Sequence, residues 1–116
     1  TSDQPALATC WVDITGDGRH LYASNTVSDN ISWFVADNAG NLTLLDVFPI
    51  PSLAPMDFPV DVSLSIDDQY FYAVQTLTAN IVGWRVEADG SLSLLPDQPM
   101  LISGASSPFG LVILSR

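Results

Sequence analysis

Apolar and polar residues alternate over short stretches of this chain, and clusters of Gly, Asp and Asn separate the stretches. Alternation with a period of two is typical of strands that bury one face, because successive side chains point to opposite sides of a sheet. No stretch keeps the 3.6-residue period of a helix, so we expect no helix longer than a turn. The pattern predicts strands at residues 11–15, 20–25, 31–35, 42–47, 60–66, 70–75, 81–86 and 92–95.

The same pattern returns after fifty residues. Residues 9–47 align with residues 59–97 without a gap, and eleven of the aligned positions are identical. A repeat of this length with four antiparallel strands is typical of a β-propeller blade, because one such unit cannot bury its own apolar face. We therefore predict an all-β fold with two four-stranded blades. A β-sandwich is the alternative, and it explains the number of strands but not the gapless repeat.

Proline-rich segments follow each repeat, at residues 48–58 and 96–108. We expect them to carry the chain from the outermost strand of one blade to the innermost strand of the next, since proline stiffens extended chain. The apolar segment 109–114 then predicts a single innermost closing strand, within residues 107–116. Two blades and one strand correspond to part of a ring of about seven blades.

Such a part is expected to need partners, because a blade normally packs against a neighbour on both faces. The remaining blades would come from a complementing upstream fragment of the same protein or from self-association of copies of this chain. We expect aromatic side chains to contribute to the open lateral faces: Trp11, Trp33, Phe34, Tyr72 and Trp84.

Charge excludes several partners. The chain has three Arg and no Lys against thirteen acidic residues, for a net charge of -10. Nucleic acids and anionic membranes bind through clustered cations, so neither is expected to bind. No apolar run is long enough to span a membrane.

Cys10 is the single cysteine and lies in an apolar run, which predicts a buried, inert thiol. Localisation stays open, with an extracellular or periplasmic location favoured over the cytoplasm.

Ligands of propellers usually bind at the axial face, where the crossings and the loops between second and third strands gather. Asp57 is the only acid beside the start of a predicted innermost strand, which makes it the first candidate for a polar ligand contact. Capping of nearby backbone N–H groups is its alternative role. Asp29 is a second candidate. The aromatic residues Trp11, Phe58 and Phe109 are further candidates for contacts with a sugar or peptide.

No catalytic set is visible, and neither a cofactor nor a metal is expected. His20 is the only histidine, so the chain offers no histidine pair for a metal. It follows a turn at the end of the blade opposite the axial face, and Tyr70 occupies its position in the second repeat. Nucleophile, phosphate-loop and zinc-protease motifs are absent. The catalytic residues are therefore left unassigned.

Specific motifs resemble one family. The sequence Val-Asp-Ile-Thr-Gly-Asp-Gly-Arg-His-Leu-Tyr-Ala-Ser-Asn at 12–25 resembles the strand–turn–strand motif of lactonase-type seven-bladed propellers. Residues 30–45 resemble the segment that follows this motif, and residues 62–95 repeat both. The closest resemblance is Glu-Ala-Asp-Gly-Ser-Leu at 87–92. The family includes 6-phosphogluconolactonase and carboxymuconate cyclase-like proteins.

The resemblance implies hydrolysis of a lactone or other cyclic ester of a small polar acid. It also implies that a histidine, arginines and an acid on the axial face polarise the carbonyl and activate water. None of Arg19, Arg85 and Arg116 matches such a position, so the catalytic groups are expected in other blades. The alternative is a non-catalytic propeller that binds a small ligand, a sugar or a protein on its axial face, because a fold does not define a function.

Overall fold

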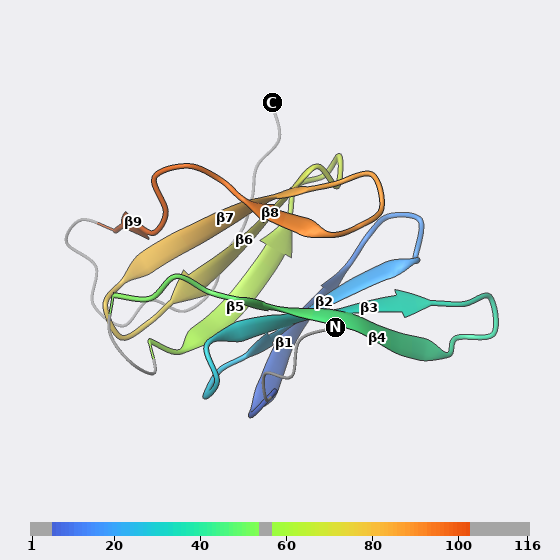
Figure 1. Cartoon of the computed structure of the whole chain (residues 1–116), viewed down its shortest axis with the longest axis horizontal. Helices are drawn as coiled ribbons and strands as arrows, with labels where there is room; N and C mark the ends of the chain where they lie inside the picture. Colours follow the sequence, from blue (N-terminus) through green and yellow to red (C-terminus); the bar gives the residue numbers. More distant parts are fainter. Residues whose placement is uncertain (1–5, 54–56, 103–116) are drawn as a thin grey trace.

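The computed structural model describes residues 6–53 and 57–102. The regular structure in these residues consists of strands arranged in two antiparallel sheets (Figure 1). The first sheet runs in chain order through β1 (Thr9–Ile14), β2 (His20–Asn25), β3 (Asn30–Ala36) and β4 (Leu42–Pro49). The second runs through β5 (Pro59–Leu64), β6 (Tyr70–Gln75), β7 (Asn80–Val86) and β8 (Leu92–Leu94), with β9 (Met100–Leu101) also paired to β7. The all-β, blade-like prediction is confirmed.

The outer edge of the second sheet differs from the predicted single strand at 92–95. β9 continues the ladder, so that Asn80 pairs with Leu101 where Asn30 pairs with Pro49 in the first sheet. The second outer edge therefore carries two residues more than the fifty-residue repeat allows. Proline interrupts a ladder because it has no N–H, and two prolines lie between β8 and β9. Every other predicted strand boundary agrees with the structure to within two residues.

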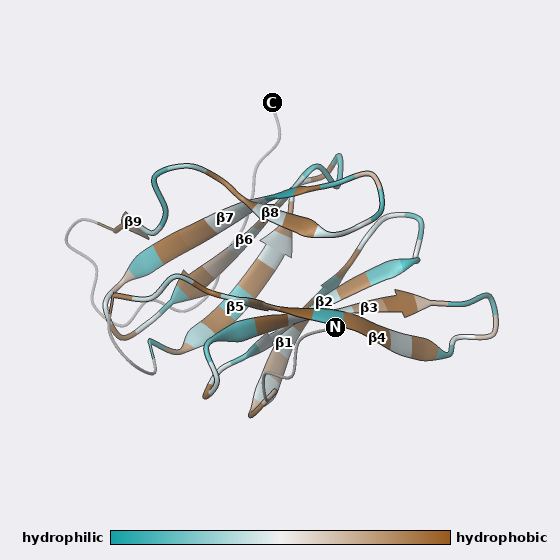
Figure 2. Ribbon diagram, viewed as in Figure 1, coloured by the Kyte–Doolittle hydropathy of each residue, from teal (hydrophilic) through white to brown (hydrophobic). Residues whose placement is uncertain are grey.

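The hydrophobic core lies between the two sheets. Tyr22, Phe71 and Trp84 form its centre. The ring centroids of Tyr22 and Phe71 lie 5.0 Å apart, and those of Phe71 and Trp84 lie 5.7 Å apart. The Tyr22 hydroxyl donates a 2.6 Å hydrogen bond to the Gly90 carbonyl in the other sheet. Burial raises the pKa of Tyr22, which keeps this hydroxyl protonated as a donor. Along the strands apolar residues alternate with more polar ones, and polar residues gather at the turns (Figure 2), as expected for sheets that pack face to face.

Polar contacts also connect the sheets. The Leu64 N–H donates to Asp13 Oδ2 at 2.8 Å, and Thr26 Oγ1 donates to the Pro59 carbonyl at 2.9 Å. Thr76 occupies the position of Thr26 in the second repeat. Its Oγ1 is buried and has no hydrogen-bond partner in the described part of the chain. The junction between the sheets is therefore held by bonds that only one of the two repeats makes.

One face of the first sheet is apolar and exposed. Val12 is 58% exposed, whereas Val62, its counterpart in the second repeat, is 5% exposed. Leu42 and Leu92 differ in the same way, at 53% and 7%. Val62 and Leu92 of the second sheet pack against the first sheet. Their counterparts in the first sheet lie on its other face, which points away from the second sheet. Identical residues thus have opposite environments because only one of the two sheets has a neighbour on that face.

Two predictions about buried groups are wrong. Trp33 and Trp84 are 8% and 2% exposed, so they lie between the sheets and not on an open lateral face. Cys10 is exposed rather than buried. β1 is the edge strand of its sheet, and in the described part of the chain no element covers the start of this strand. An apolar run predicts burial only where a second element covers it.

Candidate functional site

Buried amide side chains lie where the second strand of each sheet turns into the third. In the first sheet, Asn25 Nδ2 donates to Asn30 Oδ1 at 2.7 Å and to Ser32 Oγ at 2.9 Å. In the second sheet, Gln75 Nε2 donates to Asn80 Oδ1 at 2.9 Å. Each of these five side chains is at most 2% exposed. The network therefore fixes the loop between β2 and β3 and the loop between β6 and β7 through buried side chains. Both loops lie at the end of the sheets where the sequence analysis predicts ligand binding.

Asp57 belongs to this network and is fully buried. Its Oδ1 accepts hydrogen bonds from the Thr78 N–H and hydroxyl, both at 2.8 Å. Its Oδ2 accepts from Asn80 Nδ2 at 3.0 Å and from the Leu53 N–H at 3.2 Å. Burial acts to raise the pKa of this carboxyl, but the bonds from Thr78, Asn80 and Leu53 outweigh it and lower the pKa. The ionised carboxylate thus fastens the crossing segment to the loop between β6 and β7, and its contact with a ligand stays a prediction.

Asp29 joins the two sheets at the same end. Its Oδ2 accepts from the Asp57 N–H and its Oδ1 from the Phe58 N–H, both at 3.1 Å. Asp29 has a φ of 51°, in the left-handed region that Asp adopts more readily than most residues. Phe58 also has a positive φ, 60°, and is half-buried. The structure therefore brings Asp29, Asp57 and Phe58 together at the junction between the sheets.

The two remaining candidate contacts lie apart from this group. Trp11 is half-buried and packs against the hydrophobic core. Phe109 lies outside the described residues, as does the predicted closing strand at 107–116.

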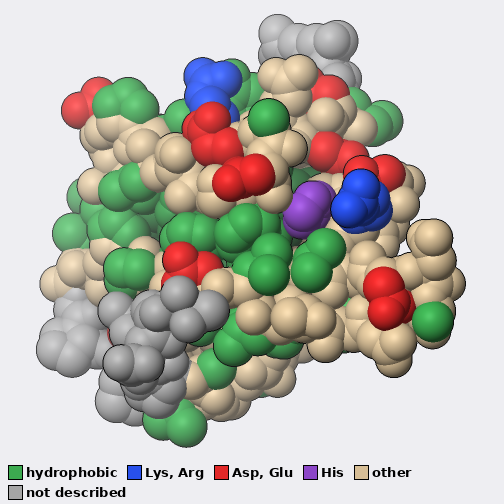
Figure 3. Space-filling view, turned by 45° about the vertical axis from the view of Figure 1, so that its right-hand side comes forward, with side chains coloured by type: hydrophobic (Ala, Val, Ile, Leu, Met, Phe, Trp, Pro, Cys, Tyr) green, Lys and Arg blue, Asp and Glu red, His purple; other side chains and the backbone are tan. Residues whose placement is uncertain are grey.

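His20 lies at the start of β2, at the other end of the sheets from the amide network. Its Nδ1 accepts a 3.1 Å hydrogen bond from Trp33 Nε1, which the sequence pattern did not predict. The ring also packs so closely on Gly90 that a Cβ there would lie 2.5 Å from it. An arginine side chain lies directly beside the histidine on this face, with acidic side chains nearby (Figure 3). His20 therefore packs against hairpin turns.

The two arginines in the described residues lie at the His20 end as well. Arg19 immediately precedes His20, and Arg85 pairs with Tyr70, the counterpart of His20 in the second repeat. The Arg85 guanidinium lies 5.4 Å from the centre of the Tyr70 ring. In residues 6–53 and 57–102, cationic groups and the Asp57 network thus occupy opposite ends of the sheets. This part of the chain also contains no group of three or more His, Cys, Asp or Glu side chains that could hold a metal ion, and no helix in it could cross a membrane.

A four-stranded antiparallel meander that repeats and packs face to face on its copy defines a β-propeller blade. The family model for the lactonases, described as "Lactonase, 7-bladed beta-propeller", matches residues 6–102. The chain belongs to this family, and the resemblance seen in the sequence motifs is confirmed. No curated protein matches the chain.

Solved structures share the fold. A proposed 6-phosphogluconolactonase of Bacteroides fragilis is 20% identical, with a TM-score of 0.73 over 87% of this chain and 28% of its own. A periplasmic gluconolactonase of Pseudomonas aeruginosa is 18% identical, with a TM-score of 0.70 over 82% of this chain and 27% of its own. Virginiamycin B lyase of Staphylococcus aureus is 15% identical, with a TM-score of 0.58 over 93% of this chain and 32% of its own. The chain thus spans about a third or less of these structures.

Proposed function

We propose that the protein hydrolyses a lactone or cyclic ester of a small polar acid, with this chain forming part of the propeller. The observation that carries the proposal is membership of the lactonase family over residues 6–102. Two structural neighbours with gluconolactonase names support it. The periplasmic location of one of these neighbours also supports a location outside the cytoplasm.

In this proposal the described residues build the wall of the site. Lactone hydrolysis needs a general base for water and positive groups for the negative charge that develops on the carbonyl oxygen. The described cations lie at the wrong end of the sheets for this task. The network of Asp57, Asp29 and the buried amides instead fixes the loops between which a substrate would bind. The catalytic base and cations would then come from other parts of the propeller.

The proposal includes further blades as neighbours of this chain. Support comes from the apolar face around Val12 and Leu42, whose counterparts Val62 and Leu92 are covered by a sheet. These blades would come from another part of the same protein or from a second copy. Native mass spectrometry and light scattering of the purified protein test this. A species larger than 12.5 kDa is expected, whereas a stable monomer that unfolds cooperatively would contradict the need for neighbours.

Lactonase activity is tested with the purified, fully assembled protein. We expect acid release from glucono-δ-lactone or 6-phosphogluconolactone, followed in a pH-stat, to exceed spontaneous hydrolysis. Muconolactone tests the other substrate class of the family. No turnover of any of the three would contradict the hydrolase proposal. Saturable binding of the same lactones without turnover would then favour a propeller that only binds its ligand.

A further inference from the structure

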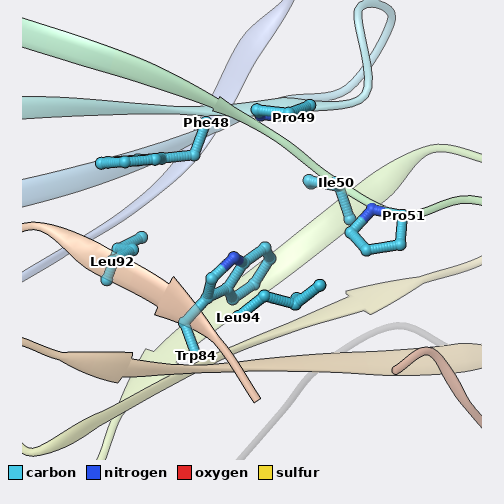
Figure 4. A pocket seen from close by; sticks show the side chains of 7 residues that line it. All are labelled: Phe48, Pro49, Ile50, Pro51, Trp84, Leu92 and Leu94. Carbon is cyan, nitrogen blue, oxygen red and sulfur yellow. The ribbon is translucent and has the colours of Figure 1, made fainter. Parts of the chain in front are cut away.

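An apolar pocket of about 350 Å³ lies between the two sheets, and none of the Asp57 network lines it (Figure 4). One wall is the chain at residues 48–51, where β4 ends and the crossing begins. The other wall consists of Trp84, Leu92 and Leu94 from the second sheet. Both walls belong to the described chain, so the pocket exists without any further blade.

Proline explains why the space is open. Pro49 and Pro51 offer no N–H for a ladder, and the Ile50 N–H between them donates to the Asp29 carbonyl at 3.0 Å. The Pro51 carbonyl accepts a 3.1 Å hydrogen bond from Gln75 Nε2 in the second sheet, so this part of the crossing is held to both sheets but forms no backbone ladder with the second. The side chains of Phe48 and Ile50 extend toward the second sheet over the gap (Figure 4).

One polar group faces this apolar space. Trp84 is 2% exposed, and its indole nitrogen lies on the side of the ring toward Phe48 and Ile50 (Figure 4). Trp33, in contrast, satisfies its indole N–H by donating to His20 Nδ1 at 3.1 Å. No described residue accepts a hydrogen bond from the Trp84 indole. The indole N–H is not among the enclosed groups without a partner, so it is open to the pocket, where a ligand oxygen would replace water as its hydrogen-bond acceptor.

We propose that this pocket binds a small, mainly apolar ring compound that carries one carbonyl or hydroxyl oxygen, which accepts a hydrogen bond from Trp84. At about 30 Å³ for each heavy atom, the share of a water molecule in the liquid, the pocket holds roughly ten to twelve heavy atoms. No charged side chain lines it, which disfavours ionised ligands such as sugar acids. Leu94 is 49% exposed and leaves an entry from solvent. The site is thus chemically distinct from one that takes a small polar lactone.

Two probes with the same bicyclic skeleton test the role of the oxygen: 1-tetralone, which has a carbonyl, and tetralin, which does not. Indole N–H signals of the ¹⁵N-labelled protein are followed by NMR, with the Trp84 signal assigned from Trp84→Phe. We expect 1-tetralone to shift the Trp84 signal and to bind about tenfold more tightly than tetralin. Trp84→Phe should abolish this preference. Phe34 occupies the equivalent position of the first repeat, so phenylalanine is compatible with the strand.

A matched pair of variants tests the location. Leu94→Asp places a charge in the pocket wall, and Leu44→Asp places the same charge at the equivalent position of the first repeat, which is 43% exposed. Only Leu94→Asp should weaken 1-tetralone binding, by tenfold or more. The proposal is overturned by an unchanged Trp84 signal at the solubility limit of 1-tetralone, or by equal effects of the two variants. It is also overturned if the Trp84 signal moves with protein concentration alone, because a second copy would then fill the pocket.

Discussion

Replacing Asp57 by Asn tests whether this carboxylate holds the loop end of the second sheet together. The native side chain accepts hydrogen bonds from four donor groups, two of them the N–H and hydroxyl of Thr78. The amide has one acceptor oxygen, so its NH₂ group would face donors such as Asn80 Nδ2 or the Leu53 N–H. A hydrogen bond to a charged group contributes about 1.5–3 kcal/mol, and a buried donor without an acceptor costs about 1–3 kcal/mol. For two lost contacts we expect the free energy of unfolding to fall by about 3–5 kcal/mol.

Urea unfolding at pH 7, followed by tryptophan fluorescence, measures this loss. The matched control is Asp97→Asn, which removes the same charge at an exposed position. The control should change the free energy of unfolding by no more than about 0.5 kcal/mol. If the two variants unfold at the same urea concentration, the carboxylate is not the structural clamp inferred above.

The pH dependence of this loss follows from the direction of the pKa shift. The pKa of Asp57 is lower in the folded chain than its ordinary value of 3.8. The contribution of the Asp57 carboxylate to the free energy of unfolding is therefore fully present above the pKa that this carboxyl has in the unfolded chain. It disappears as the pH falls through the lower pKa of the folded chain. The difference between the native protein and Asp57→Asn should stay constant from pH 7 to about 5 and shrink below about 4. A difference that persists unchanged to pH 2 would contradict an ionised native carboxylate.

Three further experiments test the junction, each by urea unfolding at pH 7. Asp29→Ala removes two acceptors of backbone N–H groups and should cost about 2–4 kcal/mol; a loss under 1 kcal/mol would show that the bridge between the sheets contributes little. Thr26→Val should cost about 1 kcal/mol more than Thr76→Val, because only Thr26 has an acceptor across the junction; equal costs would refute this role. Gly90→Ala should be more destabilising than Gly40→Ala by at least about 1 kcal/mol, since both have positive φ but only Gly90 is packed against the histidine ring. Equal effects would mean that the ring moves away freely.

The repeat was sufficient to predict the blades. Alternation predicts the strands, and the fifty-residue spacing predicts that two sheets are built alike. What it could not predict are the contacts that differ between the repeats. The counterpart of Asp57 is Leu7, so comparison of the repeats offered no sign that a carboxylate belongs in the network. Its donors Thr78 and Asn80 follow more than twenty residues later and meet it only in the folded chain.

The features that the sequence pattern did not predict have a common physical cause. A loop aspartate is usually solvated, and an apolar run is usually covered, but both tendencies depend on which elements lie nearby. Asp57 is buried because a later loop supplies its donors, and Cys10 is exposed because no element among the described residues covers the start of β1. The pocket at Trp84 likewise depends on the path of a crossing segment that has no periodic pattern. The local pattern of apolar and polar residues therefore predicts the strands well, but it does not predict which elements pack over a given residue.

The contrast between Val12 and Val62 makes the chain a reporter of its own assembly. An aspartate at Val62 would be buried whatever surrounds the protein, and should always be harmful. An aspartate at Val12 should be tolerated where that face meets water and harmful where another blade covers it. Comparing the abundance of the two variants inside cells would therefore reveal whether the face is occupied there, without purifying the protein or knowing its partner.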